Sequence, residues 1–289
     1  MKKQGLLLST AIAGFVVAAG AASVSAQDAA PEGDAALPIA VQMYTLRNFG
    51  SVEEQLAIVE EAGVSAVELV GTHDMSAEDL NGLLDAHGIE AVSAHVQLDA
   101  LRSGIEDVIE FNKAVGNEVI TVPYLAEEAR PTDAEGWTAL GEELEEFAGQ
   151  LEAEGLQLAY HNHDFEMEEF DGQTALEVMF DAAPSVLAQL DVAWIDRAGL
   201  DAAEYIANFD GRLFAIHAKD NAPEGEAEEE DGWAAVGSGT IDWQAVLTAA
   251  NDAGAQWYII EHDNPADASA TVDSSARFLE QELPGILGE

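Results

Sequence analysis

The chain has 289 residues, of which 56 are Asp or Glu and only 10 are Lys or Arg, so its formal net charge is −46. This charge argues against a nucleic-acid partner, because phosphate binding depends on clustered Lys and Arg side chains. Acids spread over every predicted helix are typical of a salt-loving protein with a solvated surface, and they would be repelled by an anionic membrane. The absence of Cys excludes disulfides and thiolate metal sites.

The first 26 residues predict a cleavable secretory signal. Lys2 and Lys3 precede an apolar run over residues 6–22, and a stretch of small residues ends at Ala26. The apolar run is shorter than the ~20 residues that a membrane span needs. We therefore expect cleavage before Gln27 and a periplasmic or secreted protein that has no membrane anchor after cleavage.

Residues 27–37 are predicted to be a disordered leader, and residues 38–289 a single domain. Within that domain, eight short apolar stretches predict strands that are buried on both faces. In chain order they are Ile39–Thr45, Ala66–Val70, Glu90–Val96, Glu118–Pro123, Leu156–His161, Ala188–Val192, Phe214–Lys219 and Trp257–Glu261. Segments with helical spacing of apolar residues separate them, among them Ser51–Ala62, Ser76–His87, Leu98–Val115 and Thr132–Glu154.

This alternation predicts an α/β fold, a closed (β/α)₈ TIM barrel, rather than an open doubly wound sheet, which usually has fewer strands. No glycine-rich phosphate loop follows the first strand, which argues against a dinucleotide-binding fold. The longest irregular stretch is Asp220–Thr240, whose acidic run Glu224–Asp231 we interpret as a solvated loop. Gly237, Ser238 and Gly239 would let the far end of this loop approach a ligand.

Polar side chains gather at the carboxyl ends of the predicted strands, where a TIM barrel builds its active site. A single buried His or Asp is more often structural, but charges at the ends of apolar strands must be paired, hydrogen-bonded or metal-bound. Imidazoles and carboxylates without thiols suit Mn²⁺, Zn²⁺, Co²⁺ or Fe²⁺. The residues in question are Glu68, His95, His161, His163, Asp191, His217, Lys219 and Glu261.

Lys219 is a separate case, because only two lysines follow the signal segment and the other, Lys113, falls on a predicted helix. Lys219 lies two residues from His217, on the same face of the strand. It could contact substrate, or it could form an ion pair with Asp220 or with an acid of the barrel.

Seven motifs together resemble the sugar phosphate isomerase/epimerase family, the xylose isomerase-like TIM barrels, from about Ile39 to Leu283. They are VQMYTLR, AVELVG, YHNHDFE, LDVAW, HAKD, GSGTIDW and YIIEHD. The resemblance implies one divalent metal ion, Mn²⁺ foremost, held by Asp191, His217 and Glu261. The fourth ligand of the family is a Glu on the fifth strand, where this chain has His161, with His163 two residues further on.

The chemistry implied by the resemblance is proton abstraction beside a carbonyl, with an enediolate intermediate. Glu261 would be both ligand and base, and the opposing acid could be Glu68, His163 or His95. Gln42, Tyr44, His163, Trp194 and Lys219 would hold the substrate, although Trp194 could equally belong to the core.

The leading hypothesis is therefore a metal-dependent isomerase or epimerase that acts on a free sugar, a keto-sugar or a polyol derivative. A phosphorylated substrate is not expected, since no Arg cluster or glycine-rich helix start is visible. One alternative is a lyase or hydrolase of 3-keto-glycosides that uses the same site. Another is a periplasmic sugar-binding barrel without turnover, which is suggested by His161 at the position where the family has a Glu. A DNA repair nuclease, the third alternative, would need a basic surface, and the acidic composition argues against it. The sequence is compatible with a homodimer but does not predict the oligomeric state.

Overall fold

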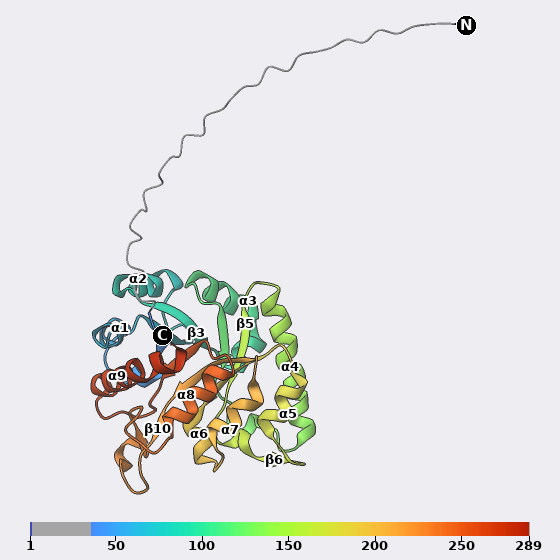
Figure 1. The fold of residues 1–289 in the computed structure, drawn as a ribbon. Coiled ribbons are helices and arrows are strands. Elements are labelled where there is room, and N and C mark those ends of the chain that lie inside the picture. The colour runs from blue at the N-terminus through green and yellow to red at the C-terminus, as the bar shows by residue number, and fades with distance from the viewer. Residues whose placement is uncertain (2–35, 289) are drawn as a thin grey trace. The chain divides into compact units, whose positions relative to one another are not determined.

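A computed structural model of the protein describes Met1 and residues 36–288 (Figure 1). The predicted signal peptide, apart from Met1, and the predicted leader up to residue 35 lie outside these residues, so both stay predictions. Leu37–Glu289 form one compact unit.

Eight parallel strands close into a barrel, which confirms the predicted fold. In the order in which they pair, the strands are β1 (Ile39–Gln42), β12 (Trp257–Ile260), β9 (Leu213–Ala218), β8 (Leu187–Asp191), β5 (Gln157–His161), β4 (Val119–Val122), β3 (Glu90–His95) and β2 (Ala66–Val70). Each predicted strand overlaps one of them, because runs of buried apolar residues mark strands that are covered on both faces.

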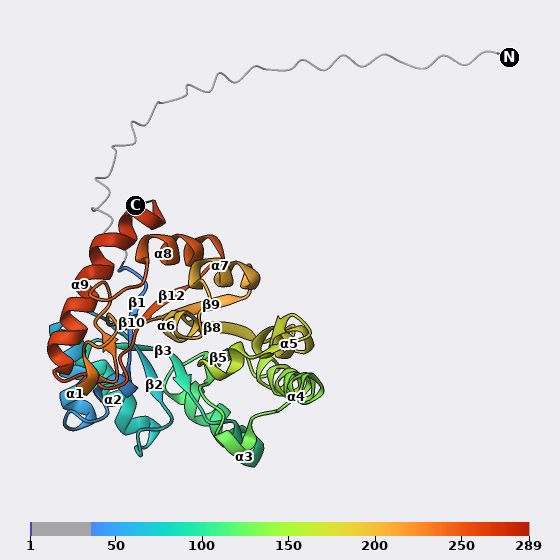
Figure 2. The ribbon, with the colours of Figure 1, turned by 90° about the horizontal axis from the view of Figure 1, so that it is seen from below.

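Helices form a ring around the strands (Figure 2). They are α1 (Val52–Glu61), α2 (Ala77–His87), α3 (Leu98–Ala114), α4 (Ala134–Glu152), α5 (Ala175–Ala182), α6 (Val192–Arg197), α7 (Ala202–Ile206), α8 (Trp243–Asp252) and α9 (Ala268–Leu287). Among residues 36–288, none of these helices has both the length and the hydropathy needed to cross a bilayer.

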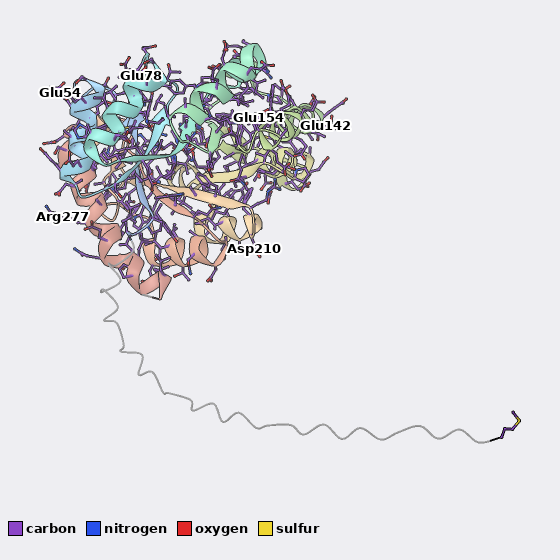
Figure 3. The ribbon with its side chains drawn as sticks, turned by 90° about the horizontal axis from the view of Figure 1, so that it is seen from above. Glu54, Glu78, Glu142, Glu154, Asp210 and Arg277 are labelled. Atoms are coloured by element: carbon purple, nitrogen blue, oxygen red, sulfur yellow. The ribbon has the colours of Figure 1, made fainter. Side chains whose placement is uncertain are left out.

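The helices are amphipathic, and their outer faces carry the acids of the chain. In α4, for example, Trp137 and Leu144 are buried, whereas Glu142 is exposed. Figure 3 shows Glu142 and the exposed acids Glu54 and Glu78 at the periphery of the barrel. Carboxylates in these positions keep their hydration, so the acidic composition is compatible with an apolar core.

The first strand ends earlier than predicted. The sequence predicts a strand as far as Thr45, but β1 ends at Gln42 and a 3₁₀ helix, η1 (Met43–Leu46), follows. The reason is local, because the side chain of Gln42 accepts a hydrogen bond from the backbone N–H of Tyr44 at 2.9 Å and caps that helix. The turn places Tyr44 at the mouth of the barrel.

The remaining elements are short. They are the 3₁₀ helices η2 (Glu127–Ala129), η3 (Phe165–Met167), η4 (Ala207–Phe209) and η5 (Glu228–Glu230), and the antiparallel pairs β6 (Glu169–Phe170) with β7 (Gln173–Thr174) and β10 (Asp220–Asn221) with β11 (Trp233–Ala234). The stretch that we predicted to be wholly irregular therefore contains η5 and a small hairpin.

The glycines at the end of that stretch approach a buried carboxylate, and their approach to a ligand stays a prediction. Asp220 is fully buried and accepts hydrogen bonds from the N–H groups of Gly237 and Gly239, each at 3.0 Å, and from the indole of Trp243 at 2.7 Å. A Cβ at Gly239 would overlap the Asp220 side chain. The GSGTIDW motif thus wraps around the Asp of HAKD and ties the loop after β9 to α8.

Candidate metal centre and substrate pocket

Four predicted metal ligands come together at the carboxyl end of the barrel. They are His161 at the end of β5, Asp191 at the end of β8, His217 on β9 and Glu261 directly after β12. These strands are consecutive neighbours in the barrel, which brings residues from distant parts of the chain into one cluster. One ligand atom from each residue lies within 4.8 Å of the other three, and all four side chains are buried.

This donor set fits a divalent cation. Nδ1 of His161 is buried and has no hydrogen-bond partner in the described part of the chain, which is rare for a polar atom in a protein interior. Two imidazoles and two carboxylates are a ligand combination that Mn²⁺, Zn²⁺, Co²⁺ and Fe²⁺ accept. The two carboxylates, Asp191 and Glu261, would balance the charge of one such ion. A bound ion would therefore satisfy both the free nitrogen and the buried negative charge.

His217 is held between two carboxylates. Its Nδ1 lies 2.6 Å from Oε2 of Glu261, and its Nε2 lies 2.7 Å from Oε1 of Glu68. Burial opposes protonation of the ring, but Glu261 and Glu68 outweigh this effect and raise the pKa of His217 to about 10. Glu68 fixes the ring through Nε2, as carboxylates behind metal-bound histidines commonly do, and Nδ1 faces Glu261 of the metal cluster. A metal ion would bind Nδ1 in place of its proton, so metal binding at His217 would release a proton.

Glu68 is the centre of a hydrogen-bonded layer beneath the metal ligands. Its Oε1 accepts a hydrogen bond from Gln42 and its Oε2 one from Gln189, each at 2.5 Å, and Nε2 of His95 lies 3.0 Å from Oε1. Burial alone would raise the pKa of Glu68, yet His95 and His217 hold it well below its ordinary value. This carboxylate is therefore ionised, and both of its oxygens are already in use.

The roles that we expected for Glu68 and Gln42 change accordingly. We considered Glu68 as an acid and Gln42 as a substrate ligand, but both side chains are fully buried and neither lines the pocket. Their side chains contact each other and the buried side chains of His217 and Gln189. His95 does line the pocket, although its Nε2 is engaged by Glu68 and by the side-chain oxygen of Gln189, 2.9 Å away.

Replacing Glu68 by Gln is expected to weaken metal binding roughly 10–100-fold, the usual effect of losing a carboxylate behind a metal ligand. Glutamine offers one acceptor oxygen, whereas Glu68 accepts donors on both of its oxygens. Mn²⁺ affinity measured by calorimetry tests this. The matched control is Glu60→Gln, because Glu60 also pairs with a histidine, His87, at 2.7 Å on the protein surface. Equal Mn²⁺ affinities in the two variants would contradict the role of Glu68.

Lys219 lies under the pocket among three carboxylates. Its Nζ is 2.5 Å from Oδ2 of Asp263, 3.3 Å from Oδ2 of Asp191 and 3.7 Å from Oε2 of Glu261. Burial would lower the pKa of Lys219, but these carboxylates raise it above its ordinary value. The lysine is fully buried and stays charged, because it neutralises the acids that surround it.

This geometry decides between the two interpretations of Lys219. Its partners are acids of the barrel and not the neighbouring Asp220, whose carboxylate accepts hydrogen bonds from the N–H groups of Gly237 and Gly239. The side chain does not line the pocket, so the structure supports the ion pair with acids of the barrel, and not the direct role toward substrate that we considered as the alternative. Its ammonium group instead lies 4.3 Å from the ring centroid of Trp233 and 5.1 Å from that of Trp194.

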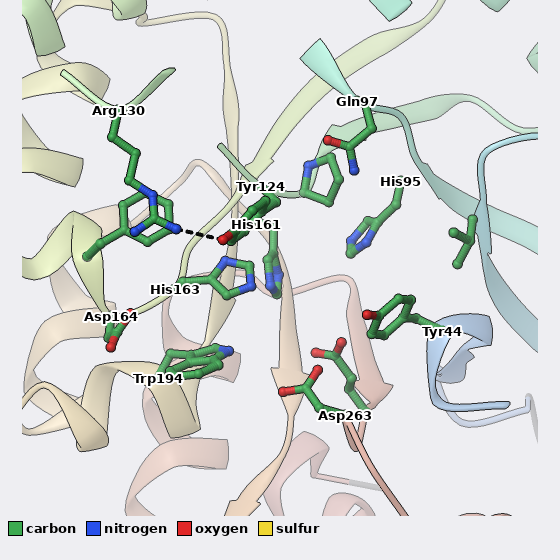
Figure 4. Close-up of a pocket in the computed structure, with 14 residues that line it drawn as sticks. Tyr44, His95, Gln97, Tyr124, Arg130, His161, His163, Asp164, Trp194 and Asp263 are labelled. Carbon is green, nitrogen blue, oxygen red and sulfur yellow. Dashed lines mark hydrogen bonds between the residues drawn. The ribbon is translucent and has the colours of Figure 1, made fainter. Parts of the chain in front are cut away.

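A pocket of about 440 Å³ opens above the cluster (Figure 4). Six of the predicted site residues line it, namely Tyr44, His95, His161, His163, Trp194 and Glu261. Asp191 and His217 are not in its wall and are fully buried. His161 and Glu261 are therefore the members of the metal cluster through which the pocket reaches the ion site.

His163 faces the pocket and not the metal cluster. The compact four-donor group contains His161 and excludes His163, whose ring centroid lies 5.0 Å from that of His161. Its backbone N–H donates to Oε2 of Glu166 at 2.8 Å, and Tyr160 donates to the other oxygen of this buried carboxylate at the same distance. Burial and then Lys219 lower the pKa of His163 to about 3, so the ring is neutral. Its Nδ1 has no partner among the described residues.

Several residues of the pocket wall are not among the site residues predicted from the sequence. Asp263 could have been found, because it stands two residues after Glu261 and projects the same way, and Tyr124 follows β4 almost directly. Arg130 gives no such signal, since it lies in an irregular segment after η2 and reaches the pocket only through the tertiary fold. The other five are Val70, Gln97, Pro123, Asp164 and Phe165.

Comparisons with known proteins agree with this architecture. Solved structures that resemble the chain include a sugar phosphate isomerase/epimerase from Parabacteroides distasonis ATCC 8503, with a TM-score of 0.71 and 18% identity over 87% of this chain and 96% of that one. The IolI protein with a bound zinc atom has a TM-score of 0.68 and 17% identity over 87% and 98% of the two chains. A D-tagatose 3-epimerase-like protein has a TM-score of 0.65 and 20% identity over 87% and 99%.

At these identities the solved structures establish the fold alone, and none of the curated proteins matches the chain. The family model supplies the assignment, because the model described as xylose isomerase-like TIM barrel matches residues 56–282, most of the domain. The chain therefore belongs to the xylose isomerase-like TIM barrel family.

Proposed function

We propose that the protein is a divalent-metal-dependent isomerase or epimerase that moves a proton at a carbon beside the carbonyl of a non-phosphorylated sugar. The observation that carries the proposal is the four-donor cluster beneath the pocket, open to it through His161 and Glu261. Mn²⁺ is the ion that we favour, with Zn²⁺, Co²⁺ and Fe²⁺ as alternatives. When bound, the ion would supply a Lewis acid that polarises the substrate carbonyl.

Glu261 is suited to remove the proton. Its contacts with His217 and Lys219 both use Oε2, and Oε1 makes no hydrogen bond within residues 36–288. The side chain also lines the pocket. One oxygen is therefore fixed in place while the other can take up a proton from a bound sugar.

His163 is the residue that best fits the opposing position. It lines the pocket, and its Nδ1 has no partner in the described chain. Because the ring is neutral at rest, it would first accept a proton from the bound sugar at Nδ1 and then return that proton to the opposite face. His95 is less suited, because its Nε2 is shared between Glu68 and Gln189, and Glu68 is buried out of reach. The structure thus supports His163 among the three candidates that the sequence left open.

The pocket also supports a neutral substrate. Among residues 36–288, Arg130 is the one Arg or Lys side chain in the pocket wall. Its guanidinium is already engaged, because it donates to the carbonyl of Leu125 at 3.0 Å and to the hydroxyl of Tyr124 at 2.7 Å. Phosphate recognition usually relies on several such groups or on a helix N-terminus. The predicted signal peptide supports a further part of the proposal, a periplasmic or secreted location where phosphorylated sugars are scarce.

The test is exchange of a substrate proton with solvent. We expect Mn²⁺-loaded protein in D₂O to introduce deuterium at one carbon of a suitable ketose or aldose. NMR measures this exchange across a panel of unphosphorylated sugars. His163→Gln is expected to slow this exchange about 10²–10⁴-fold without loss of the metal, because it removes a proton-transfer group and no ligand. Tight sugar binding with no exchange would overturn the enzyme proposal in favour of a sugar-binding barrel.

A further inference from the structure

We propose that the pocket mouth contains a second subsite that holds another ring, so that the substrate is a neutral keto-glycoside, with its carbonyl on a ring carbon other than the anomeric one, and not a free monosaccharide. The inference rests on the proposed function for the inner end of the pocket. It concerns two tyrosines that the acid–base chemistry does not use, Tyr44 and Tyr124.

These tyrosines are exceptional on the protein surface. Among residues 36–288 they are the only large hydrophobic side chains that are exposed, each with 40% of its surface accessible. Single exposed apolar residues are common and need no explanation. Here, however, both of them line the same pocket, on a protein whose surface is otherwise dominated by carboxylates. Exposed aromatic groups gathered at one concave site are typical of a binding surface.

Tyr44 is held in place before any ligand binds. Its backbone N–H is bonded to Gln42 at 2.9 Å, and Arg47 donates to its carbonyl oxygen at 2.8 Å. The guanidinium of Arg47 also lies 3.8 Å from the centroid of the Tyr44 ring. Arg47 is not part of the pocket wall. The arginine therefore supports the ring from outside the pocket and leaves the exposed part of it available to a ligand.

Tyr124 is fixed from the other side of the mouth. Its hydroxyl accepts a hydrogen bond from Arg130 at 2.7 Å, and its ring meets those of His163 and Phe165 edge-on, with centroids 5.0 and 5.9 Å apart. Arg130 in turn lies over Phe165, 3.7 Å from the centroid of that ring. Rigid rings of this kind bind at low entropic cost, because little side-chain freedom is lost.

The two tyrosines lie at a different depth from the metal cluster. His161 and Glu261 at the floor are 2% and 5% exposed, against 40% for each tyrosine. Figure 4 shows Tyr44 and Tyr124 on different sides of the opening, with His161 and His95 between them. A sugar whose carbonyl reaches the floor leaves the mouth to whatever is attached to it. The pocket volume of 440 Å³ falls in the range of sites for drug-sized ligands.

The chemistry of the mouth selects the attached group. A pyranose ring or an aromatic aglycone presents an apolar face that packs on tyrosine, while the phenol hydroxyls serve its polar edge. Gln97 and Asp164 at the same mouth can bond further hydroxyls. A net charge of −46 disfavours an anionic attachment. The occupant that fits is thus the second ring of an uncharged glycoside.

Calorimetry with Mn²⁺-loaded protein tests the subsite through binding alone. The probes are the methyl and phenyl glycosides of 3-keto-β-D-glucose and 3-keto-β-D-galactose, which keep a ring carbonyl. Within each pair, only the group that would occupy the mouth differs. We expect the phenyl compounds to bind roughly three- to tenfold more tightly than their methyl counterparts. Tyr44→Ala and Tyr124→Ala should each reduce that preference, whereas Tyr44→Phe, which keeps the ring, should retain it.

Equal affinity for phenyl and methyl glycosides, a phenyl preference that survives both alanine variants, or no binding of any probe would overturn the second subsite. These results are separate from the deuterium exchange experiment. Exchange on free sugars together with no phenyl preference would leave the isomerase proposal standing without the subsite. A tyrosine-dependent phenyl preference with no exchange on any sugar would support the subsite and contradict the isomerase proposal.

Discussion

Replacing Lys219 by Met is expected to destabilise the metal-free barrel by about 3–5 kcal/mol, the usual cost of removing one partner from a buried ion pair. The change leaves Asp191, Glu261 and Asp263 without the ammonium group that now lies between them. Methionine has a similar length and keeps the packing against Trp233. The loss of stability would therefore come from the missing charge and not from a cavity.

The same variant should respond more strongly to metal than the native protein. A divalent cation neutralises Asp191 and Glu261, two of the three carboxylates that lose their partner, so added Mn²⁺ should restore much of the lost stability. Urea unfolding with and without Mn²⁺ measures both effects.

The matched control is Lys113→Met, the only other lysine after residue 3. Lys113 pairs with Glu154 at 3.0 Å with about half of each side chain exposed, so its removal should cost less than about 1 kcal/mol and show no metal dependence. If the two variants lost the same stability, Lys219 would not be the charge that compensates the cluster.

Removing Asp191 is expected to abolish stoichiometric metal binding while the barrel stays folded. Asp191→Ala deletes one of the two carboxylates in the donor group, and His217→Ala, which deletes an imidazole, should have the same effect. Metal content after gel filtration and the unfolding midpoint are the measurements.

Asp191 also has a structural task, which requires a control. Its Oδ1 accepts hydrogen bonds from the N–H groups of Ala193 and Trp194 at 3.0 and 3.1 Å and caps α6. Asp201→Ala removes a cap of the same kind, at the start of α7, where Asp201 accepts from Glu204 at 3.0 Å. Both variants should lose about 0.5–2 kcal/mol of stability from the cap, but only Asp191→Ala should lose the metal. Full metal occupancy in Asp191→Ala or in His217→Ala would refute the ligand assignment.

The sequence by itself determined the barrel and three of the four members of the metal cluster. Strands buried on both faces read as apolar runs, and helices read as amphipathic ones, because each periodicity reflects which side of an element faces water. An ionisable residue at the end of an apolar strand is conspicuous for the same reason. Asp191, His217 and Glu261 were therefore among the candidates, and the family resemblance marked these three as metal ligands. Strand order then brought them together.

Only the tertiary structure decided what each polar residue contacts. His161 and His163 both face the carboxyl end of the barrel, and the closed barrel alone places the first in the cluster and the second in the pocket wall. Glu68 and Lys219 look like pocket residues in sequence but lie buried beneath it. The reason is physical. Local periodicity fixes the side of a strand to which a residue points, whereas its depth in the barrel depends on the stagger of neighbouring strands, a property of distant pairings that no short stretch of sequence encodes.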